Sequence, residues 1–186
     1  MSFSLHGDRV IVREWRDSDV EAFVALNADP EVRRFFPSVL SREQSLAELG
    51  RIREHGQREG FTFWAVEVPG VAELIGFTGL LRTPYSTHFT PCVEIGWRMA
   101  RAYWGKGYAT EAARLCLDWG FQQEGIDEIV ALATLTNLPS HAVMERLGMQ
   151  RNPADDFDHP RLEAGHPLRP HLLYRIKRQD RRQMQA

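Results

Sequence analysis

The spacing of hydrophobic residues changes period several times along the chain. Apolar and polar residues alternate in "RVIVREW", residues 9–15, which is typical of a half-buried strand. Apolar residues then recur at helical spacing in residues 17–27 and 41–60, and Ser41 is a suitable N-cap for the second segment. This first part of the chain is predicted to form a strand followed by two helices.

The pattern becomes β-rich after the second helix. Short runs rich in β-branched and aromatic residues follow one another, separated by Pro/Gly turns or by a longer loop. These runs are residues 61–68, 72–81 and 92–99. Their order predicts an antiparallel meander.

The second half of the chain alternates helices and strands. A helix is predicted over residues 109–121, with small apolar residues at positions i, i+3, i+4 and i+7 beginning at Ala109. Residues 128–135 form a nearly continuous apolar run, which is typical of a central strand covered by helices. A short helix over residues 139–149 and a last strand over residues 171–178 complete the pattern.

A long connection of residues 150–170 joins these last two elements. It contains four prolines and has no period, which is unusual inside a compact domain, so we expect a substrate-facing loop. Its acidic and histidine residues match no metal-ligand spacing, so no metal is predicted. These residues, with one just beyond the loop, are Asp155, Asp156, Asp158, His159, His166 and His171. We expect the acidic part to be solvated and, as a hypothesis, to attract a cationic amine.

Length and composition indicate an ordinary globular domain. The chain has 186 residues, 43% hydrophobic residues and a formal charge of -2, which suit one domain and give no electrostatic footprint for nucleic acid. Cys92 and Cys116 form no CxxC or other metal motif, so both are expected to be small buried hydrophobes. The N-terminus has no continuous apolar segment, so a cytoplasmic protein with no membrane partner is expected.

Two glycines stand immediately before the predicted helix, in the stretch "YWGKGYATE". The first backbone N–H groups of a helix have no partner within it, and Gly105 and Gly107 leave room for a phosphate to approach them. Lys106 adds a nearby positive charge. The stretch lacks both a Walker sequence and the third glycine of a dinucleotide fingerprint. It predicts an anion site, and the alternative is a turn in which glycine only relieves strain.

The glycine turn belongs to a longer pattern. The run "VEIGWRMARAYWGKGYATEAARLCLDWGF" is followed after a strand by "TNLPSHAVMERLGM". Together they closely resemble the GNAT superfamily of acyl-coenzyme A-dependent N-acetyltransferases, in particular the branch of ribosomal-protein N-terminal acetyltransferases. The resemblance covers Gly7 to Arg178, nearly the whole chain.

The resemblance implies a fold, a domain organisation and a reaction. The fold is α/β (α+β), a mixed and mainly antiparallel central sheet flanked by helices. It occupies a single N-acetyltransferase domain of residues 1–178, followed by a polar tail of residues 179–186. The resemblance also implies acetyl-CoA as cosubstrate, an amine acceptor and, as in many members, a homodimer.

The same resemblance implies which residues hold the coenzyme. The family's R/Q-x-x-G-x-G/A loop binds the pyrophosphate largely through backbone N–H groups. Its positions fall here on Trp104, Gly105, Lys106, Gly107, Tyr108 and Ala109. Trp104 replaces the usual arginine or glutamine, which is expected to change packing more than binding. Main-chain groups of Trp97, Arg98 and Met99 are expected to contact the pantetheine arm.

Glu94 is the candidate general base. It lies on the predicted strand 92–99, on the same face as Cys92 and Gly96, and a carboxylate there can take the amine proton through a water. The alternative is a glutamate on the solvent side of the strand. His88, in the preceding loop, is a second and weaker candidate for the base.

The leaving thiolate lacks the acid that is usual in the family. A tyrosine often stands seven residues after the asparagine of the second block, and Met144 occupies that place relative to Asn137. Ser140, a feature of the branch, is the candidate that holds or protonates the thiolate instead. A thiol with a pKa of about 8.5 also leaves reasonably well unaided. Asn137 and Ser140 can cap a helix as well, and at least one of them is expected to contact coenzyme A.

Direct attack of the amine in a ternary complex is the predicted reaction, because no nucleophilic triad is apparent. The acceptor is a small-molecule amine or a protein N-terminus, and Phe35, Phe36 and Tyr85 are candidate walls of its pocket. Two alternatives stay open. One is a catalytically silent acyl-CoA-binding or regulatory module, which Trp104 and Met144 allow. The other is a nucleotide-binding domain, which the meander disfavours.

Overall fold

The computed structural model of this chain describes residues 3–185, so residues 1–2 of the predicted domain and residue 186 of the predicted tail lie outside the description. The elements, in chain order, are β1 (Ser4–His6), β2 (Ile11–Arg13), η1 (Asp17–Asp19), α1 (Val20–Ala28), α2 (Arg42–Glu59), β3 (Phe63–Val68), β4 (Ala72–Arg82), β5 (Val93–Met99), η2 (Arg101–Tyr103), α3 (Tyr108–Gly120), β6 (Glu128–Thr134), α4 (Leu138–Arg146), β7 (Gln150–Arg151), η3 (Pro153–Asp155), β8 (Phe157–Asp158), β9 (Pro170–Lys177) and α5 (Arg178–Gln185). The predicted elements appear in the predicted order, whereas β1, β7, β8 and α5 were not predicted.

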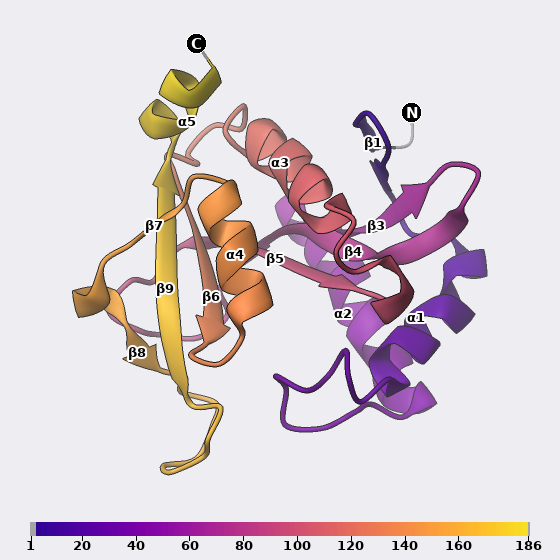
Figure 1. The fold of residues 1–186 in the computed structure, drawn as a ribbon, viewed down its shortest axis with the longest axis horizontal. Helices are drawn as coiled ribbons and strands as arrows, with labels where there is room; N and C mark the ends of the chain where they lie inside the picture. The colour runs from indigo at the N-terminus through magenta and orange to yellow at the C-terminus, as the bar shows by residue number, and fades with distance from the viewer. Residues whose placement is uncertain (1–2, 186) are drawn as a thin grey trace.

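The strands form one mixed sheet in the order β1-β2-β3-β4-β5-β6-β9-β7, and β8 pairs with β9 off this path. β5 and β6 are parallel, and the other paired strands of the described chain are antiparallel. Helices α3 and α4 lie on one face of the sheet, and α1 and α2 lie on the other (Figure 1). The predicted mainly antiparallel sheet flanked by helices is confirmed, and the alternation of a dinucleotide-binding fold is absent from residues 3–185.

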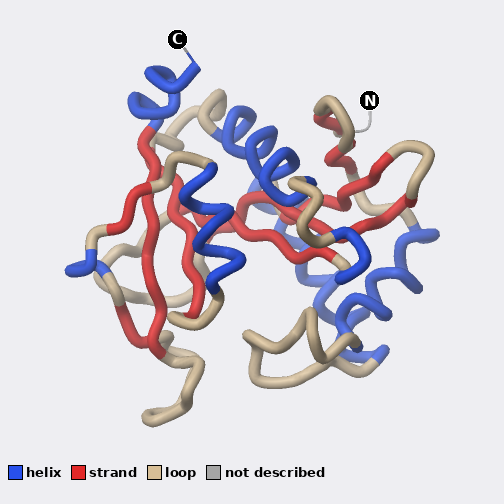
Figure 2. The backbone as a smooth tube through the Cα atoms, in the orientation of Figure 1, coloured by secondary structure: helices blue, strands red, loops and turns tan. Residues whose placement is uncertain are grey.

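The parallel strands β5 and β6 separate soon after they meet. Their register consists of the pairs Val93–Ile129 and Glu94–Val130. β5 remains paired with β4 as far as Met99, and β6 remains paired with β9 as far as Thr134. Figure 2 shows the two strands diverging, which divides the molecule into two halves. The edge of β5 that faces β6 therefore has main-chain groups available to a ligand.

Helix α3 fixes the position of the glycine turn. Its inner face carries Ala112, Ala113 and Cys116, each with 0% exposure in the main core. Small residues let the helix lie close to the sheet, because a Cβ added at Gly120 would meet the side chain of Leu80 at 2.6 Å. A close-packed interior is hardly compressible, so α3 is held rigidly beside β4 and β5.

The C-terminal end is more structured than the predicted polar tail of residues 179–186. Arg181 on α5 is buried and donates hydrogen bonds to both carboxylate oxygens of Asp118 on α3, with N–O distances of 2.7 and 2.9 Å. A two-pronged arginine–carboxylate contact is among the stronger ion pairs in proteins. The first turn of α5 is thus docked on the domain rather than free, and the boundary at residue 178 stays a prediction.

Candidate active site

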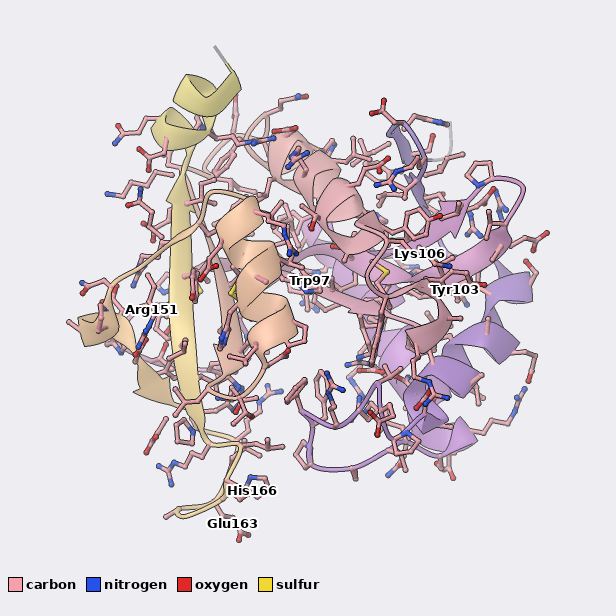
Figure 3. All side chains as sticks on the ribbon, viewed as in Figure 1. Trp97, Tyr103, Lys106, Arg151, Glu163 and His166 are labelled. Atoms are coloured by element: carbon pink, nitrogen blue, oxygen red, sulfur yellow. The ribbon has the colours of Figure 1, made fainter. Side chains whose placement is uncertain are left out.

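A cavity of about 1340 Å³ opens where β5 and β6 separate. The predicted site residues that line it are Glu94, Trp97, Arg98, Met99, Trp104, Gly105, Gly107, Tyr108, Ala109, Asn137 and Ser140. In Figure 3, Trp97 lies between the two halves of the molecule. Lys106 is outside the described lining, and its amine lies over the Tyr103 ring, 5.6 Å from the ring centre. The fold thus brings the predicted residues of distant segments to one cavity, and their contacts with coenzyme A stay a prediction.

The glycine turn has the geometry of an anion site. Gly105 and Gly107 have φ angles of 72° and 81°, in the left-handed region that favours glycine. A Cβ added at Gly105 would meet nothing within 4 Å, so a ligand can approach the main chain there. Gly107 is the N-cap of α3, and no side chain of the described residues caps it. The first N–H groups of α3 are therefore open to an anion and carry the positive end of the helix dipole.

Trp104 connects this turn to the end of β5. Its indole Nε1 donates a hydrogen bond of 2.7 Å to the carbonyl oxygen of Met99. The guanidinium carbon of Arg34 lies 5.2 Å from the centre of the Trp104 ring. The residue that replaces the family's usual arginine or glutamine therefore has a packing role, and it occupies one of the main-chain acceptors expected to serve the pantetheine arm.

Arg9, which sequence reasoning missed, clamps the glycine turn from the far end of the chain. Its backbone N donates to Oε1 of Glu111 at 2.7 Å, its Nε donates to Oε2 at 2.8 Å, and its Nη1 donates to the carbonyl oxygen of Lys106 at 2.9 Å. The clamp holds the turn and pairs with a carboxylate in the first turn of α3. Glu111 lies 102 residues after Arg9, so no local sequence signal predicts the contact.

The side chain of Arg98 points away from the glycine turn toward α1 and α2. It donates to Oδ1 of Asn27 at 2.6 Å and lies 3.3 Å from Oε2 of Glu48. Its guanidinium carbon also lies 4.5 Å from the ring centre of Phe36 and 4.9 Å from that of Phe77. Arg98 therefore builds the wall of the cavity with its side chain, and only its main chain remains a candidate for the coenzyme.

Glu94 has the position and proton affinity of a general base. It belongs to the last residue pair before β5 and β6 separate, and it lines the cavity. Burial raises the pKa of its carboxyl to about 7, while a hydrogen bond from Thr83 and the charge of Arg161 act in the opposite direction. A carboxyl with this pKa can accept a proton near neutral pH. Glu94 is partly exposed, but it lines the cavity, which argues against the alternative position on the solvent side of the sheet.

Thr83 confirms the predicted shared face of Glu94 and Cys92. Its Oγ1 lies 3.4 Å from Oε2 of Glu94 and 3.2 Å from Sγ of Cys92. Burial raises the pKa of the Cys92 thiol and, more strongly, that of the Cys116 thiol. Cys116 is fully buried as predicted, whereas Cys92 is only partly buried. Both thiols are therefore poor nucleophiles near neutral pH.

His88, the second candidate base, is wrongly assigned. Its imidazole is 50% exposed, and its Nε2 lies 4.0 Å from Oδ1 of Asp155, outside the cavity lining that the structure describes. The loop that carries it turns this side chain to the surface. A histidine in an irregular loop has no periodicity from which its direction can be predicted.

Asn137 and Ser140 lie where α4 begins and both line the cavity. Oδ1 of Asn137 accepts a hydrogen bond of 3.2 Å from the backbone N of Ser140, so the predicted cap is present. Met144 lies one turn further along α4, is 1% exposed and also lines the cavity. The place of the family's usual tyrosine is therefore filled by an apolar side chain that faces the same space.

Two loops border the opposite end of the cavity, and Figure 1 shows one of them below α1 and α2 and the other below β9. Phe35 and Phe36 from one loop line it together with Tyr85, as predicted. His159 and Arg161 from the long connection also line it, so this loop does reach the site. The His159 ring centre lies 4.9 Å from that of Tyr85, and the Arg161 guanidinium carbon lies 5.4 Å from the Tyr85 ring centre.

The acidic residues of the long connection lie in ion pairs away from the cavity. The pairs are Asp155–Arg175, Asp156–Arg151 and Asp158–Arg169, and none of the three aspartates belongs to the described cavity lining. Arg175 also pairs with Glu128, but the position of the aspartates argues against the hypothesis that they attract a cationic amine to the site. His166 lies with Glu163 at the far tip of this loop (Figure 3).

Metal clusters and membrane-spanning helices are both absent from the described residues. Residues 3–185 contain no group of three or more His, Cys, Asp or Glu side chains arranged to hold a metal ion. Over the same residues, every helix is too short or too polar to cross a bilayer.

The fold and the cavity together define an acyltransferase class. A mainly antiparallel sheet opens between two parallel strands, and the opening holds a glycine turn, a helix start and a buried carboxyl of raised pKa. Residues 9–150 match the profile of the acetyltransferase (GNAT) domain, so the chain belongs to the GNAT family of acetyl-CoA-dependent N-acetyltransferases. The enzyme class predicted from the sequence is thereby confirmed.

Known proteins support this family in both sequence and fold. The chain is 32% identical to the Bacillus subtilis protein YkkB over 143 residues, which are 76% of this chain and 82% of YkkB. Its fold is similar to a GNAT-family acetyltransferase from Bacillus anthracis, with a TM-score of 0.77, 24% identity and coverage of 95% and 99% of the two chains. It is also similar to RimL, a ribosomal L7/L12 α-N-protein acetyltransferase solved with coenzyme A, with a TM-score of 0.75, 15% identity and coverage of 94% and 98%.

Proposed function

We propose that this protein transfers the acetyl group of acetyl-CoA to a primary amine by direct attack in a ternary complex, with Glu94 as the general base. The observation that carries the proposal is the carboxyl of Glu94, with a pKa of about 7, at the point of the cavity where β5 and β6 part. The reaction joins an amine nitrogen to a thioester carbonyl and releases coenzyme A as a thiol.

The anionic parts of acetyl-CoA fit the end of the cavity beside α3. The open turn at Gly105 and Gly107 accommodates the pyrophosphate against backbone N–H groups. Arg114 of α3 and Arg146 of α4 are exposed, line the same cavity and supply two further positive charges toward the gap between these helices. These charges suit the remaining phosphate of the coenzyme. The free edge of β5 then serves the extended pantetheine arm.

Glu94 handles the proton of the attacking amine. An alkyl amine has a pKa of about 10 and an α-amine about 8, so either is largely protonated near neutral pH and must lose a proton. The carboxylate of Glu94 takes this proton directly or through one water. Thr83, 3.4 Å from Oε2, orients the carboxylate.

The leaving thiolate is served by the start of α4. Ser140 lines the cavity, and its backbone N is already held by Asn137 at 3.2 Å, which fixes the direction of the serine side chain. The Ser140 hydroxyl stabilises or protonates the thiolate. Met144 supplies no proton, so departure of the thiol relies on its own acidity more than in relatives that have a tyrosine.

The acceptor is a primary amine of a small molecule or of a protein N-terminus. RimL acts on a protein α-amine by its description, and its fold covers 94% of this chain. A homodimer is proposed on the same family resemblance, and a cytoplasmic location stays a prediction. The cavity end between Phe35 and Tyr85 receives the acceptor.

Steady-state kinetics and mass spectrometry test the proposal. Coenzyme A release with a panel of amines and peptides is expected to follow sequential kinetics, with an N-acetylated product and no acetyl group on Cys92 or Cys116. Tight binding of acetyl-CoA without turnover of any amine would instead favour a silent acyl-CoA-binding module, which the buried Met144 at the tyrosine position allows.

A further inference from the structure

The charges around the acceptor end of the cavity do not balance. Arg34 pairs with Glu31 at 3.3 Å, and Arg98 lies 3.3 Å from Glu48. Arg161 also lines the cavity, but no carboxylate of the described residues lies in ion-pair contact with it. The acceptor end therefore carries an exposed guanidinium group without an ion-pair partner among the described residues.

The neighbours of Arg161 do not neutralise its positive charge. The three aspartates of its own loop are taken by other arginines. His159 beside it is uncharged near neutral pH, because burial lowers the pKa of this imidazole to about 4. Glu94 is close enough for Arg161 to lower its pKa, but burial dominates and leaves that carboxyl only partly ionised near pH 7. An incoming anion would balance the guanidinium better than any group already present.

Tyr85 supplies a second group that lacks a partner. Its hydroxyl is buried, and it has no hydrogen-bond partner among the described residues, although Tyr85 lines the cavity. A buried hydroxyl without a hydrogen-bond partner is destabilising, so a ligand that accepts from it gains affinity. The ring of Tyr85 meets the His159 ring edge-on and lies under the guanidinium of Arg161, so the hydroxyl and the guanidinium belong to one wall.

We infer that the acceptor is a small apolar α-amino acid whose free carboxylate is bound by Arg161 and the Tyr85 hydroxyl. This inference rests on the proposed function, because Glu94 marks the place of the amine. The amine and the carboxylate of an α-amino acid are attached to the same carbon. Arg161 is near enough to Glu94 to affect its pKa, so one small ligand can reach both residues. The apolar side chain meets Phe35 and Phe36 on the facing loop.

The carboxylate distinguishes an amino acid from other amines at this end of the cavity. A peptide N-terminus offers an amide at this place instead of a carboxylate, and a simple alkyl amine offers nothing.

A matched series of acceptors tests the inference. Leucine, leucinamide, 3-methylbutylamine and a peptide that begins with leucine share one side chain and differ at the carboxyl position. We expect Arg161→Gln to lower kcat/KM for leucine about 10- to 100-fold, the range for loss of one charge-assisted contact. The value for leucinamide should change less than about twofold, since no carboxylate is lost. Comparing each variant with wild type on the same amine cancels the differences between amine pKa values.

Two further variants separate recognition from folding. Arg161→Lys keeps the charge but not the paired donors, so an intermediate loss for leucine is expected. Arg169→Gln is the matched control, because this arginine lies in the same loop but pairs with Asp158 and does not line the described cavity. It should leave the leucine-to-leucinamide ratio unchanged. The KM for acetyl-CoA should be unaltered in all three variants.

A binding measurement keeps the inference separate from the proposed reaction. N-acetylleucine should bind the protein–coenzyme A complex in calorimetry, and Arg161→Gln should weaken it by the same factor. If no amine releases coenzyme A, the proposed function fails and this titration still decides the inference. Absence of N-acetylleucine binding, or a wild-type preference for leucinamide or the peptide that Arg161→Gln leaves unchanged, overturns it.

Discussion

Replacing Glu94 by glutamine should make the protein more stable and less active. Burial raises the pKa of this carboxyl from 4.5 to about 7. A folded-state pKa above the unfolded value means that the contribution of the group to stability is greatest below pH 4.5 and is lost as the pH rises through about 7. Above that pH the folded protein holds a buried carboxylate that glutamine does not have.

The size of the Glu94 pKa shift determines the expected change in the free energy of unfolding. Each pKa unit corresponds to about 1.4 kcal/mol, so a rise from 4.5 to about 7 corresponds to about 3 kcal/mol for a carboxylate with no access to water. Glu94 lines an open cavity, and water there reduces the cost to about 1–3 kcal/mol. We therefore expect Glu94→Gln to raise the free energy of unfolding by this amount at pH 8 and to change it little at pH 5.

Urea denaturation followed by tryptophan fluorescence at the two pH values measures this difference. Glu73→Gln on β4 is the control, because Glu73 is exposed and lies outside the described cavity lining, so its replacement should have the same small effect at both pH values. A Glu94→Gln protein that is equally destabilised at pH 5 and pH 8 would refute the desolvated carboxylate.

The same variant tests catalysis. Loss of a positioned general base lowers kcat by about 10²-fold or more. The ratio of wild-type to variant kcat/KM should rise about tenfold between pH 6 and pH 8, because a carboxyl of pKa about 7 goes from about 9% to about 91% ionised over that range. The ratio removes the titration of the amine substrate, which both proteins share. A variant with the wild-type rate would exclude Glu94 as the base.

Three shorter predictions concern the coenzyme end and the core. Trp104→Arg loses the hydrogen bond from the indole to Met99 and should lower the free energy of unfolding by about 1 kcal/mol. The Kd for acetyl-CoA in calorimetry should stay within about threefold, because backbone N–H groups bind the pyrophosphate. A loss of affinity above tenfold contradicts this. Arg9→Ala leaves Glu111 unpaired beside the anion site, so the Kd for acetyl-CoA should rise about 5- to 10-fold. Adding Glu111→Gln should restore part of the affinity, and no recovery would argue against a charge effect. Cys116→Ala should cost about 1 kcal/mol in thermal unfolding and leave kcat unchanged, because the thiol is fully buried and poorly ionised; a lost acetyl transfer would indicate a covalent step.

The parts of the fold and site that were predictable are those with a local physical signal. Alternating polarity predicts which face of a strand carries Glu94, because neighbouring side chains point to opposite faces. A helix start preceded by glycines predicts backbone N–H groups that face a ligand, and Gly105 and Gly107 have the positive φ angles that this requires. The order of strands and helices follows from period alone.

Contacts between distant segments have no such signal. The clamp of Arg9 on Glu111 spans 102 residues, and nothing near either residue indicates the other. The charge of the long connection was misjudged for the same reason. Its aspartates were counted as free, whereas the arginines that pair with them lie on β7, on β9 and at the end of the connection itself.

This difference explains why the family can be identified whereas the acceptor has to be inferred. The coenzyme end consists of a turn, a helix start and a strand edge, which are backbone features that family resemblance carries from one chain to another. The acceptor end consists of side chains from two irregular loops, such as Phe36 and Arg161, whose directions depend on tertiary packing. A relative such as YkkB, at 32% identity, can therefore share the family without sharing the acceptor, and the charges in this chain's own cavity are the better guide to what it acetylates.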